Sequence, residues 1–235
     1  MALGAGSVTP WELAGGYAVF ANGGFRISPY VVKEIYDGNG KLIARTDPVV
    51  AGESAPRVLD PRNAWLVDSM LQDVVTRGTA TRARSLKRND LAGKTGTTND
   101  YLDAWFCGYN PALLAVSWVG FSQPRHLGRG ETGGAAALPI WISYRGAALA
   151  GAPEVQRPRP DGLIEVQAGD GSRTDYQYAE YAPPAEVIGN GLGDLLRTLQ
   201  GQRRHWLRLP AFAIVAVLLP VTDGITEGST GGMAH

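Results

Sequence analysis

Apolar residues recur at helical spacing in two stretches of the N-terminal half. The first begins with Thr9-Pro-Trp-Glu12, which combines a capping hydroxyl, a proline at the first helical position and a glutamate that can reach back to the cap. Its apolar stripe runs to Ala21, and Gly23-Gly24 ends it. The second stretch begins at Asp60-Pro61 and ends near Arg77-Gly78. Its apolar positions are Ala64, Val67, Met70, Leu71 and Val74. The pattern predicts two amphipathic helices.

Shorter apolar runs predict strands and one further helix. Residues 30–36 and 41–45 flank the turn Asp37-Gly-Asn-Gly40, which predicts a β-hairpin. The apolar run around Lys94 is expected to be a strand. The remaining expected elements are strands at residues 105–109 and 113–121, joined at Asn110-Pro111, and a helix at residues 135–149 with Pro139 near its first turn. Strands bracketed by helices in this order predict an α+β fold, in which helices pack on a mostly antiparallel sheet.

The hydrophobic periodicity weakens after residue 150, and the composition changes again at residue 203. The sequence therefore predicts three regions. Residues 1–150 are expected to be the folded part, and residues 151–202 a Pro- and Gly-rich irregular extension with a short helix at 188–199. Residues 203–235 form an apolar block and a Gly/Thr-rich tail. The apolar run at 209–221 is interrupted by two prolines and is shorter than the roughly 20 residues that span a bilayer. The first seven residues lack the features of a signal peptide, so no export signal is expected in this chain.

Composition narrows the classes of function. Hydrophobic residues make up 44% and charged residues 19%, as in a globular protein. The 22 basic and 22 acidic residues balance, so nucleic acid is not an expected partner. A single cysteine, Cys107, excludes an intrachain disulfide and is expected to be a small buried hydrophobe. The hairpin turn is not a calcium loop, because Pro48 stands where the bidentate glutamate is required. We therefore expect no metal and no cofactor.

The segment Lys94-Thr95-Gly96-Thr97 carries the candidate chemistry. Side chains alternate along a strand, so Thr95 and Thr97 should share one face, while Gly96 between them removes bulk. A peptide can pair with such an edge by β-strand addition. The two hydroxyls can bind its carboxylate, Lys94 adds a positive charge, and the Thr97 N–H can contribute to an oxyanion hole. Losing one oxyanion-hole donor typically costs about 2.7–4 kcal/mol of transition-state stabilisation.

Two other interpretations of this tripeptide compete. Gly93-Lys94-Thr95 matches the end of a nucleotide-binding P-loop, but Arg88 stands where that motif needs its first glycine, and a strand follows instead of a helix. A Lys-Thr-Gly sequence can also occur by chance in a structural strand. The tripeptide alone does not exclude that possibility, and the surrounding sequence decides.

Seven ordered blocks resemble the C-terminal half of the transpeptidase domain of class A penicillin-binding proteins, most closely the 1A type. They are Thr9-Pro-Trp-Glu-Leu-Ala14, Phe20-Ala-Asn-Gly-Gly24, Arg77-Gly-Thr-Ala-Thr-Arg82, Leu91-Ala-Gly-Lys-Thr-Gly-Thr-Thr-Asn-Asp100, Asp103-Ala-Trp-Phe106, Trp118-Val-Gly-Phe121 and Glu131-Thr-Gly-Gly134. The likeness covers residues 2–150 well, 151–202 loosely and 203–235 not at all. It implies part of a β-lactamase/transpeptidase-like fold that lacks its N-terminal half.

The resemblance also implies an activity and a location. Such proteins are bifunctional, membrane-anchored enzymes that build peptidoglycan on the periplasmic face of the bacterial inner membrane. A glycosyltransferase domain polymerises the glycan, and the transpeptidase serine attacks a D-Ala-D-Ala stem peptide or is trapped by a β-lactam. Carried over by position, Lys94 tunes the electrostatics, Thr95 and Thr97 bind the carboxylate, Gly96 completes the substrate-binding element, and the Thr97 N–H serves the oxyanion hole.

One departure from the family pattern is serious. The family needs a Ser-x-x-Lys nucleophile and a Ser-x-Asn element, and no serine here has Lys three positions on or Asn two positions on. The nucleophile-bearing half, the glycosyltransferase domain and the only membrane anchor would then precede Met1. The chain alone is expected to be inactive, with apolar side chains left short of partners. These are Trp105, Phe106, Val116 and Trp118.

Two further hypotheses remain open. The chain can be a non-catalytic remnant that binds cell-wall peptide or a partner protein through the same strand edge. It can also be a relative of serine β-lactamases, although Asp103-Ala-Trp-Phe106 and the long extension favour the transpeptidases.

Overall fold

The computed structural model describes residues 6–167 and 174–181. Its helices are α1 (Pro10–Ala21), α2 (Pro61–Thr76) and α3 (Leu138–Ala148), with shorter helical turns η1 (Thr81–Leu86), η2 (Asn99–Tyr101), η3 (Gly133–Ala137) and η4 (Ala179–Tyr181). Its strands are β1 (Glu34–Tyr36), β2 (Leu42–Arg45), β3 (Ala92–Thr97), β4 (Asp103–Asn110), β5 (Leu113–Gly120), β6 (Leu163–Gln167) and β7 (Thr174–Tyr178).

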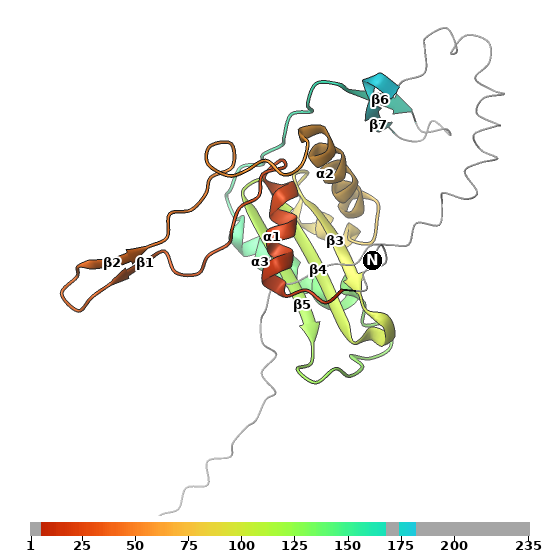
Figure 1. The fold of residues 1–235 in the computed structure, drawn as a ribbon. Coiled ribbons are helices and arrows are strands. Elements are labelled where there is room, and N and C mark those ends of the chain that lie inside the picture. The colour runs from red at the N-terminus through yellow and green to blue at the C-terminus, as the bar shows by residue number, and fades with distance from the viewer. Residues whose placement is uncertain (1–5, 168–173, 182–235) are drawn as a thin grey trace, which may run out of the picture.

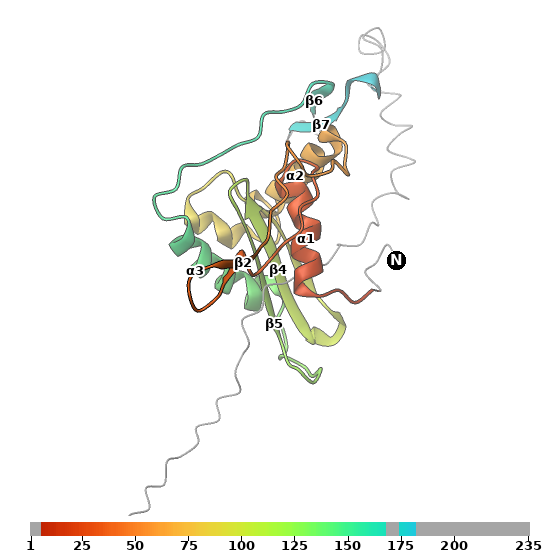
Figure 2. The same ribbon diagram turned by 60° about the vertical axis from the view of Figure 1, so that its left-hand side comes forward.

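A three-stranded antiparallel sheet, in the order β3-β4-β5, forms the centre of the molecule. Helix α1 covers one face and α3 the opposite face, while α2 runs beside β3 (Figures 1 and 2). This arrangement confirms the predicted α+β class, with helices packed on an antiparallel sheet.

The helix-start signals act as the sequence predicts. In α1 the Thr9 hydroxyl accepts the Glu12 N–H at 3.2 Å, and the Glu12 carboxylate accepts the Thr9 N–H at 2.8 Å. At α2 the Asp60 carboxylate accepts the Arg62 N–H at 2.9 Å. One position of the predicted apolar stripe differs, because Met70 is 63% exposed.

The last predicted helix begins two residues early. A π-helical turn, η3, precedes α3, and the Thr132 hydroxyl accepts the Ala135 N–H at 3.3 Å at its start. Pro139 lies in the first turn of α3. Backbone N–H groups in a first turn have no partner within the helix, so a proline there costs no hydrogen bond. In the part of the chain that the structure describes, no helix combines the length and apolar character needed to cross a bilayer.

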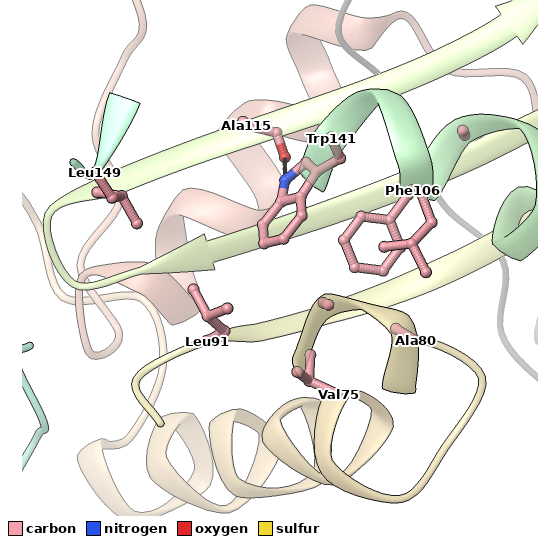
Figure 3. Packing of buried hydrophobic residues seen from close by; sticks show 10 residues of the cluster. Val75, Ala80, Leu91, Phe106, Ala115, Trp141 and Leu149 are labelled. Atoms are coloured by element: carbon pink, nitrogen blue, oxygen red, sulfur yellow. Dashed lines mark hydrogen bonds between the residues drawn. The ribbon is translucent and has the colours of Figure 1, made fainter. Parts of the chain in front are cut away.

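The larger core lies between the sheet and α3 (Figure 3). Phe106 of β4 meets Trp141 of α3 edge to face, with ring centroids 4.9 Å apart. The Trp141 indole N–H donates to the Ala115 carbonyl at 3.0 Å, so its polar atom is satisfied inside the core. Leu91 and Val75 close the cluster from the β3 side.

The expectation of unpartnered apolar side chains is wrong for Phe106 and Val116. Both are buried, Phe106 under α3 and Val116 against Leu13 of α1, because the helices within this chain cover both faces of β4 and β5. Trp105 and Trp118 are partly buried and pack on each other with centroids 5.4 Å apart.

Cys107 also lies in the cluster on the α1 face. It is a fully buried free thiol, as predicted, and its burial raises the thiol pKa. A thiol in this environment is an inert core residue.

Two hairpins extend from this body. The β1–β2 hairpin has the predicted Asp37–Gly40 turn, in which the Asp37 carboxylate accepts the N–H groups of Asn39 and Lys41. Its first strand is shorter than expected and begins at Glu34. The second hairpin, β6–β7, corrects the expectation that the extension after residue 150 is irregular throughout. The expected helix at 188–199 and the tail at 203–235 lie outside the described residues.

Candidate functional site

Strand β3 forms an edge of the central sheet, and within the described residues it pairs with β4 alone. The Thr98 N–H donates to the Asp103 carbonyl at 3.1 Å, which fixes the alternation of hydrogen bonds along the ladder. Gly96 and Lys94, two and four residues earlier, therefore pair with β4. The main-chain N–H and C=O groups of Thr95 and Thr97 point away from the sheet, along its open edge.

Lys94 carries a half-buried positive charge at this edge. Its ammonium donates to the Thr95 carbonyl at 2.9 Å, and no carboxylate forms an ion pair with it in residues 6–167 or 174–181. Removal from water disfavours the charged form, so burial lowers the pKa of Lys94. An anion that reached this edge would find an ammonium without a competing carboxylate.

Thr95 lies deeper than the sequence suggests. It is buried, and its hydroxyl lies 2.7 Å from the hydroxyl of Thr79, in the chain that follows α2. Thr79 belongs to the Arg77–Arg82 block, but its contact with the strand was not predicted. The neighbouring Gly78 is the sequence signal for this contact. A Cβ there would come within 2.8 Å of the Val74 backbone and prevent the tight turn that follows α2.

Thr97 contacts the start of η3. The Gly133 N–H donates to the Thr97 hydroxyl oxygen at 3.1 Å. A Cβ on Gly133 would lie 2.2 Å from the Trp105 carbonyl oxygen and 2.4 Å from that of Gly96, so only glycine allows the helix start to approach the strand this closely. The Glu131–Gly134 block is one of the motif blocks in the sequence, but the sequence does not predict that Gly133 packs against β3.

The structure thus brings Lys94, Thr95, Gly96 and Thr97 together on an edge strand. Thr95 and Thr97 share the face that η3 and α3 cover, as the alternation predicts. Their roles in binding stay predictions. Because the Thr95 hydroxyl is directed at Thr79, the Thr97 hydroxyl is the more accessible of the two.

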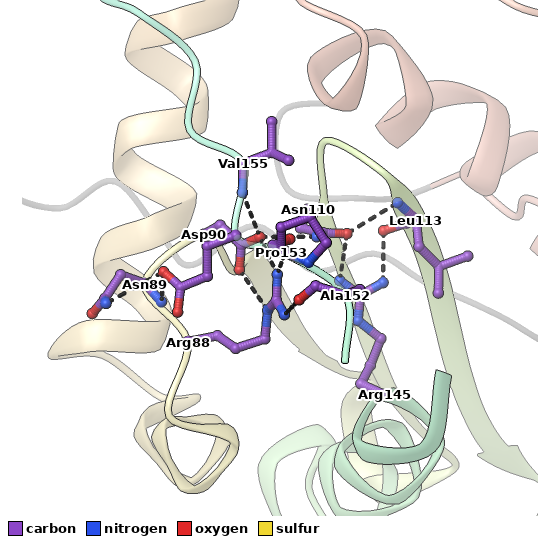
Figure 4. Close-up of polar contacts among 10 residues, drawn as sticks. Arg88, Asn89, Asp90, Asn110, Leu113, Arg145, Ala152, Pro153 and Val155 are labelled. Atoms are coloured by element: carbon purple, nitrogen blue, oxygen red, sulfur yellow. Dashed lines mark hydrogen bonds and ion pairs between the residues drawn. The ribbon is translucent and has the colours of Figure 1, made fainter. Parts of the chain in front are cut away.

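A buried polar network holds the chain where it enters β3 (Figure 4). Arg88 donates twice to Asp90, at 2.9 and 2.7 Å, and also to the carbonyls of Ala152 and Pro153. Asp90 further accepts the Val155 N–H at 3.2 Å. The network therefore ties the beginning of the C-terminal extension to the candidate strand.

The network continues to α3 through Asn110. Its amide donates to Asp90 at 2.9 Å, and its carbonyl oxygen accepts from the fully buried Arg145 at 3.0 Å. Burial lowers the pKa of Arg145 to about 10, and its Nε has no partner among the described residues. Burial alone would raise the pKa of Asp90, but the hydrogen bonds from Arg88, Asn110 and Val155 outweigh it, and the pKa is lowered.

A second buried contact fixes α2 beside the strands. The Tyr109 hydroxyl of β4 donates to the Asp68 carboxylate of α2 at 2.7 Å. Burial, together with the neighbouring Asp68 charge, raises the pKa of Tyr109, so the phenol stays protonated as a donor.

Comparisons with known proteins agree on one family. A sequence model described as the penicillin binding protein transpeptidase domain matches residues 1–137. Penicillin-binding protein 1A of Neisseria lactamica is 46% identical over 193 residues, which cover 81% of this chain and 23% of that protein. Its counterpart in Neisseria flavescens is 50% identical over 164 residues, which cover 70% and 21%. The chain thus spans less than a quarter of the length of these relatives.

Solved structures support the same relationship. The crystal structure of penicillin-binding protein 1A from Haemophilus influenzae has 34% sequence identity and a TM-score of 0.70, and the match covers 76% of this chain and 33% of that chain. A penicillin-binding protein from Mycobacterium tuberculosis, at 22% identity and a TM-score of 0.53, shares the fold over 73% of this chain and 43% of its own.

Proposed function

The chain belongs to the penicillin-binding protein transpeptidase family, and on that premise we propose that β3 is the substrate-binding strand of a peptidoglycan D,D-transpeptidase. The observation that carries the proposal is the open edge of β3, where outward main-chain groups lie beside an ammonium with no carboxylate partner in the described part of the chain. A stem peptide ending in D-Ala-D-Ala offers the matching chemistry, a main chain that can pair and a terminal carboxylate.

Each residue of the strand has a role in this proposal. The Thr97 oxygen already accepts the Gly133 N–H, which leaves the Thr97 hydroxyl hydrogen available to the carboxylate. Thr95 supports the same carboxylate site with its hydroxyl held by Thr79, and Gly96 keeps the strand narrow. Lys94 supplies positive charge, and the outward Thr97 N–H contributes to the oxyanion hole.

We further propose that the chain alone forms no acyl-enzyme. A serine hydroxyl is a weak nucleophile until a neighbouring base activates it, and no Ser-x-x-Lys occurs in the 235 residues. The acyl transfer, the trapping by β-lactams and the location on the periplasmic face of the inner membrane belong to a full-length transpeptidase that includes this part.

Labelling with a fluorescent penicillin tests the missing nucleophile. We expect no labelled band for the purified chain on a denaturing gel, because no activated serine can open the lactam. Intact penicillin-binding protein 1A from Neisseria lactamica, labelled in parallel, is the positive control. A covalent band on this chain would contradict the proposal.

The same edge also supports a second candidate, a non-catalytic module that binds cell-wall peptide. NMR titration of the chain with a D-Ala-D-Ala peptide separates the two. Saturable shifts at Thr95 and Thr97 that disappear in a Thr97→Val variant would favour the module. An unchanged spectrum at millimolar peptide would leave a fragment that cannot bind substrate by itself.

A further inference from the structure

The β1–β2 hairpin extends away from the body of the molecule as a separate two-stranded sheet (Figure 1). Among the described residues, neither strand pairs with any strand but the other. Ile35 and Tyr36 of β1 are 47% and 54% exposed, and Ile43 of β2 is 64% exposed. A two-stranded hairpin is marginally stable in water, and a third strand adds the pairing that it lacks. The hairpin therefore presents apolar side chains and two open edges.

The outer edge of β1 is regular. The Lys33 carbonyl accepts an N–H of the chain that follows β2 at 2.8 Å, and the Asp37 N–H donates to the Lys41 carbonyl at 2.9 Å. Main-chain groups alternate in direction along a strand, so the N–H and C=O groups of Glu34 and Tyr36 point away from β2. Groups of this kind form a template for a further strand.

The outer edge of β2 is irregular. Ile35 and Tyr36 face Ala44 and Leu42, so Ile43 is an extra residue on β2. A bulge interrupts the hydrogen-bond ladder of its strand, and natural proteins use bulges to prevent pairing at an edge. Of the two edges, β1 is therefore the one suited to strand addition.

The charges along β1 match a second copy of the same strand. When two β1 strands run antiparallel about a two-fold axis at Ile35, Lys33 of each copy lies opposite Asp37 of the other. Opposite charges across a strand pair are stabilising. In this register Glu34 and Tyr36 of the two copies form the hydrogen-bonded pairs, which uses the outward main-chain groups of β1.

Two other symmetric pairings are unfavourable. Two β2 strands centred on Ile43 would place Lys41 of one copy opposite Arg45 of the other. Two β1 strands centred on Glu34 would place two carboxylates opposite each other. Like charges directly opposite are destabilising, so the axis at Ile35 is the pairing that the sequence of the hairpin favours.

We propose that this chain forms a two-fold dimer through β1, which joins the hairpins of two copies into a four-stranded antiparallel sheet. Ile35 meets its counterpart at the axis in a non-hydrogen-bonded pair, with Cα atoms about 4.5 Å apart. The contact is confined to one short strand of each copy, so the dimer is weak and depends on protein concentration. The inference is independent of substrate binding at β3.

Sedimentation of the full chain over a range of concentrations tests the dimer. We expect a monomer–dimer equilibrium. Ile35→Lys should lower the association constant by about tenfold or more, because it replaces an apolar contact at the axis with two ammonium groups. Ile43→Lys is the matched control, because it adds the same charge to β2 of the same hairpin and should leave the association constant within about twofold.

The proposed charge pairs have a test of their own. Lys33→Glu places a carboxylate opposite Asp37 of the second copy, so it should lower the association constant by about threefold to tenfold. Added salt should reduce this loss, because the side chains are at the surface. A loss that does not change with salt would contradict the pairing of Lys33 with Asp37.

Disulfide formation tests the register. The native thiol of Cys107 is fully buried, so an introduced cysteine is the reactive one. Ile35→Cys should cross-link two copies under mild oxidation, because the Cα separation at the axis lies within disulfide range. Val31→Cys is the control. Val31 is 83% exposed, but the axis separates it from its counterpart by roughly 27 Å, so this variant should not be cross-linked in the same time.

Four outcomes would overturn the inference, with each variant shown to be folded by circular dichroism. The first is a chain that is monomeric at every concentration. The second is association that Ile35→Lys leaves intact, which would place the contact outside β1. The third is association that Ile43→Lys lowers and Ile35→Lys does not, since β2 would then be the pairing edge. The fourth is equal cross-linking of Ile35→Cys and Val31→Cys, which would contradict the register.

Discussion

Lys94 keeps its charge in a half-buried position without a carboxylate partner in the described part of the chain, and this should lower stability. We expect Lys94→Met to raise the free energy of unfolding at pH 7, because the methionine fills the same space without a desolvated charge. Urea unfolding at several pH values measures the difference between the two proteins.

The pH dependence of that difference has a definite sign. The pKa of Lys94 is lowered from 10.5, so the unfolded chain binds more protons than the folded one between the two values. The disadvantage of the native lysine should be constant near neutrality and should shrink as the pH rises toward 10.5. A difference that grows with pH would show that Lys94 is stabilised, not strained, by its surroundings.

Gly133 is the second residue with a measurable consequence. A Cβ there would meet the Trp105 and Gly96 carbonyl oxygens, so Gly133→Ala should push η3 off β3 and lower the free energy of unfolding by about 2 kcal/mol. Gly146→Ala in α3 is the matched control. Its Cβ would make an ordinary 3.5 Å contact with Leu86, and it should gain roughly 0.5–1 kcal/mol from helix propensity. Equal changes in the free energy of unfolding for the two variants would contradict the close approach of Gly133 to the β3 and β4 backbone.

Single residues also mark how far sequence reasoning reaches. The strand that carries Lys94 and Thr97 follows from a short apolar run in the sequence, a signal that depends only on neighbouring positions. The partners Thr79 and Gly133 were not foreseen, because each contact joins residues at least 16 positions apart and depends on how helices dock on the sheet. The predicted exposure of Phe106 failed for the same reason.

At the scale of elements, the entry to β3 depends on one buried ion pair. The side chains of Arg88 and Asp90 are 10% and 0% exposed, so Asp90→Asn leaves a guanidinium uncompensated in the interior. We expect a loss of about 3 kcal/mol in urea unfolding at pH 7. Glu165→Gln is the control, because its ion pair with Arg159 is exposed and should change stability by under about 0.5 kcal/mol.

The same pair predicts acid sensitivity. The pKa of Asp90 is lowered from 3.8, so its contribution to stability is complete above that value and is lost as the pH falls through the lower folded pKa. The stability of the native protein should therefore fall more steeply below pH 4 than that of Asp90→Asn. Parallel curves would mean that Asp90 is not charged in the folded protein.

Elements with strong local signals were predictable and the others were not. Helices α1 and α2 carry capping residues that act within one turn, and their starts were found correctly. Strands β6 and β7 have five residues each and were missed. These strands are held by tertiary contacts, such as Tyr176 packing on Trp65 of α2 with ring centroids 4.7 Å apart. A local sequence pattern does not predict such contacts.

At the scale of the molecule, the α+β class followed from the order of helices and strands, and the family from seven motif blocks. The sequence pattern did not predict that the helices of this chain bury the apolar side chains of the central sheet. Helices cover both faces of the three-stranded central sheet, while an apolar groove between α1 and α2 stays open to solvent. Whether a surface lacks a partner depends on how elements pack, which hydrophobic patterning cannot specify.

The hydrogen bonds of Arg88 and Asp90 to the main chain of residues 152–155 limit how far the polypeptide can be shortened. A chain cut after residue 150 loses the main-chain groups of Ala152, Pro153 and Val155 that complete the ion pair, and solvent then reaches it. A chain cut after residue 155 keeps them all. The contacts that hold the folded body together therefore continue at least five residues beyond residue 150, where the family resemblance weakens, and trimming into residues 152–155 should expose the ion pair.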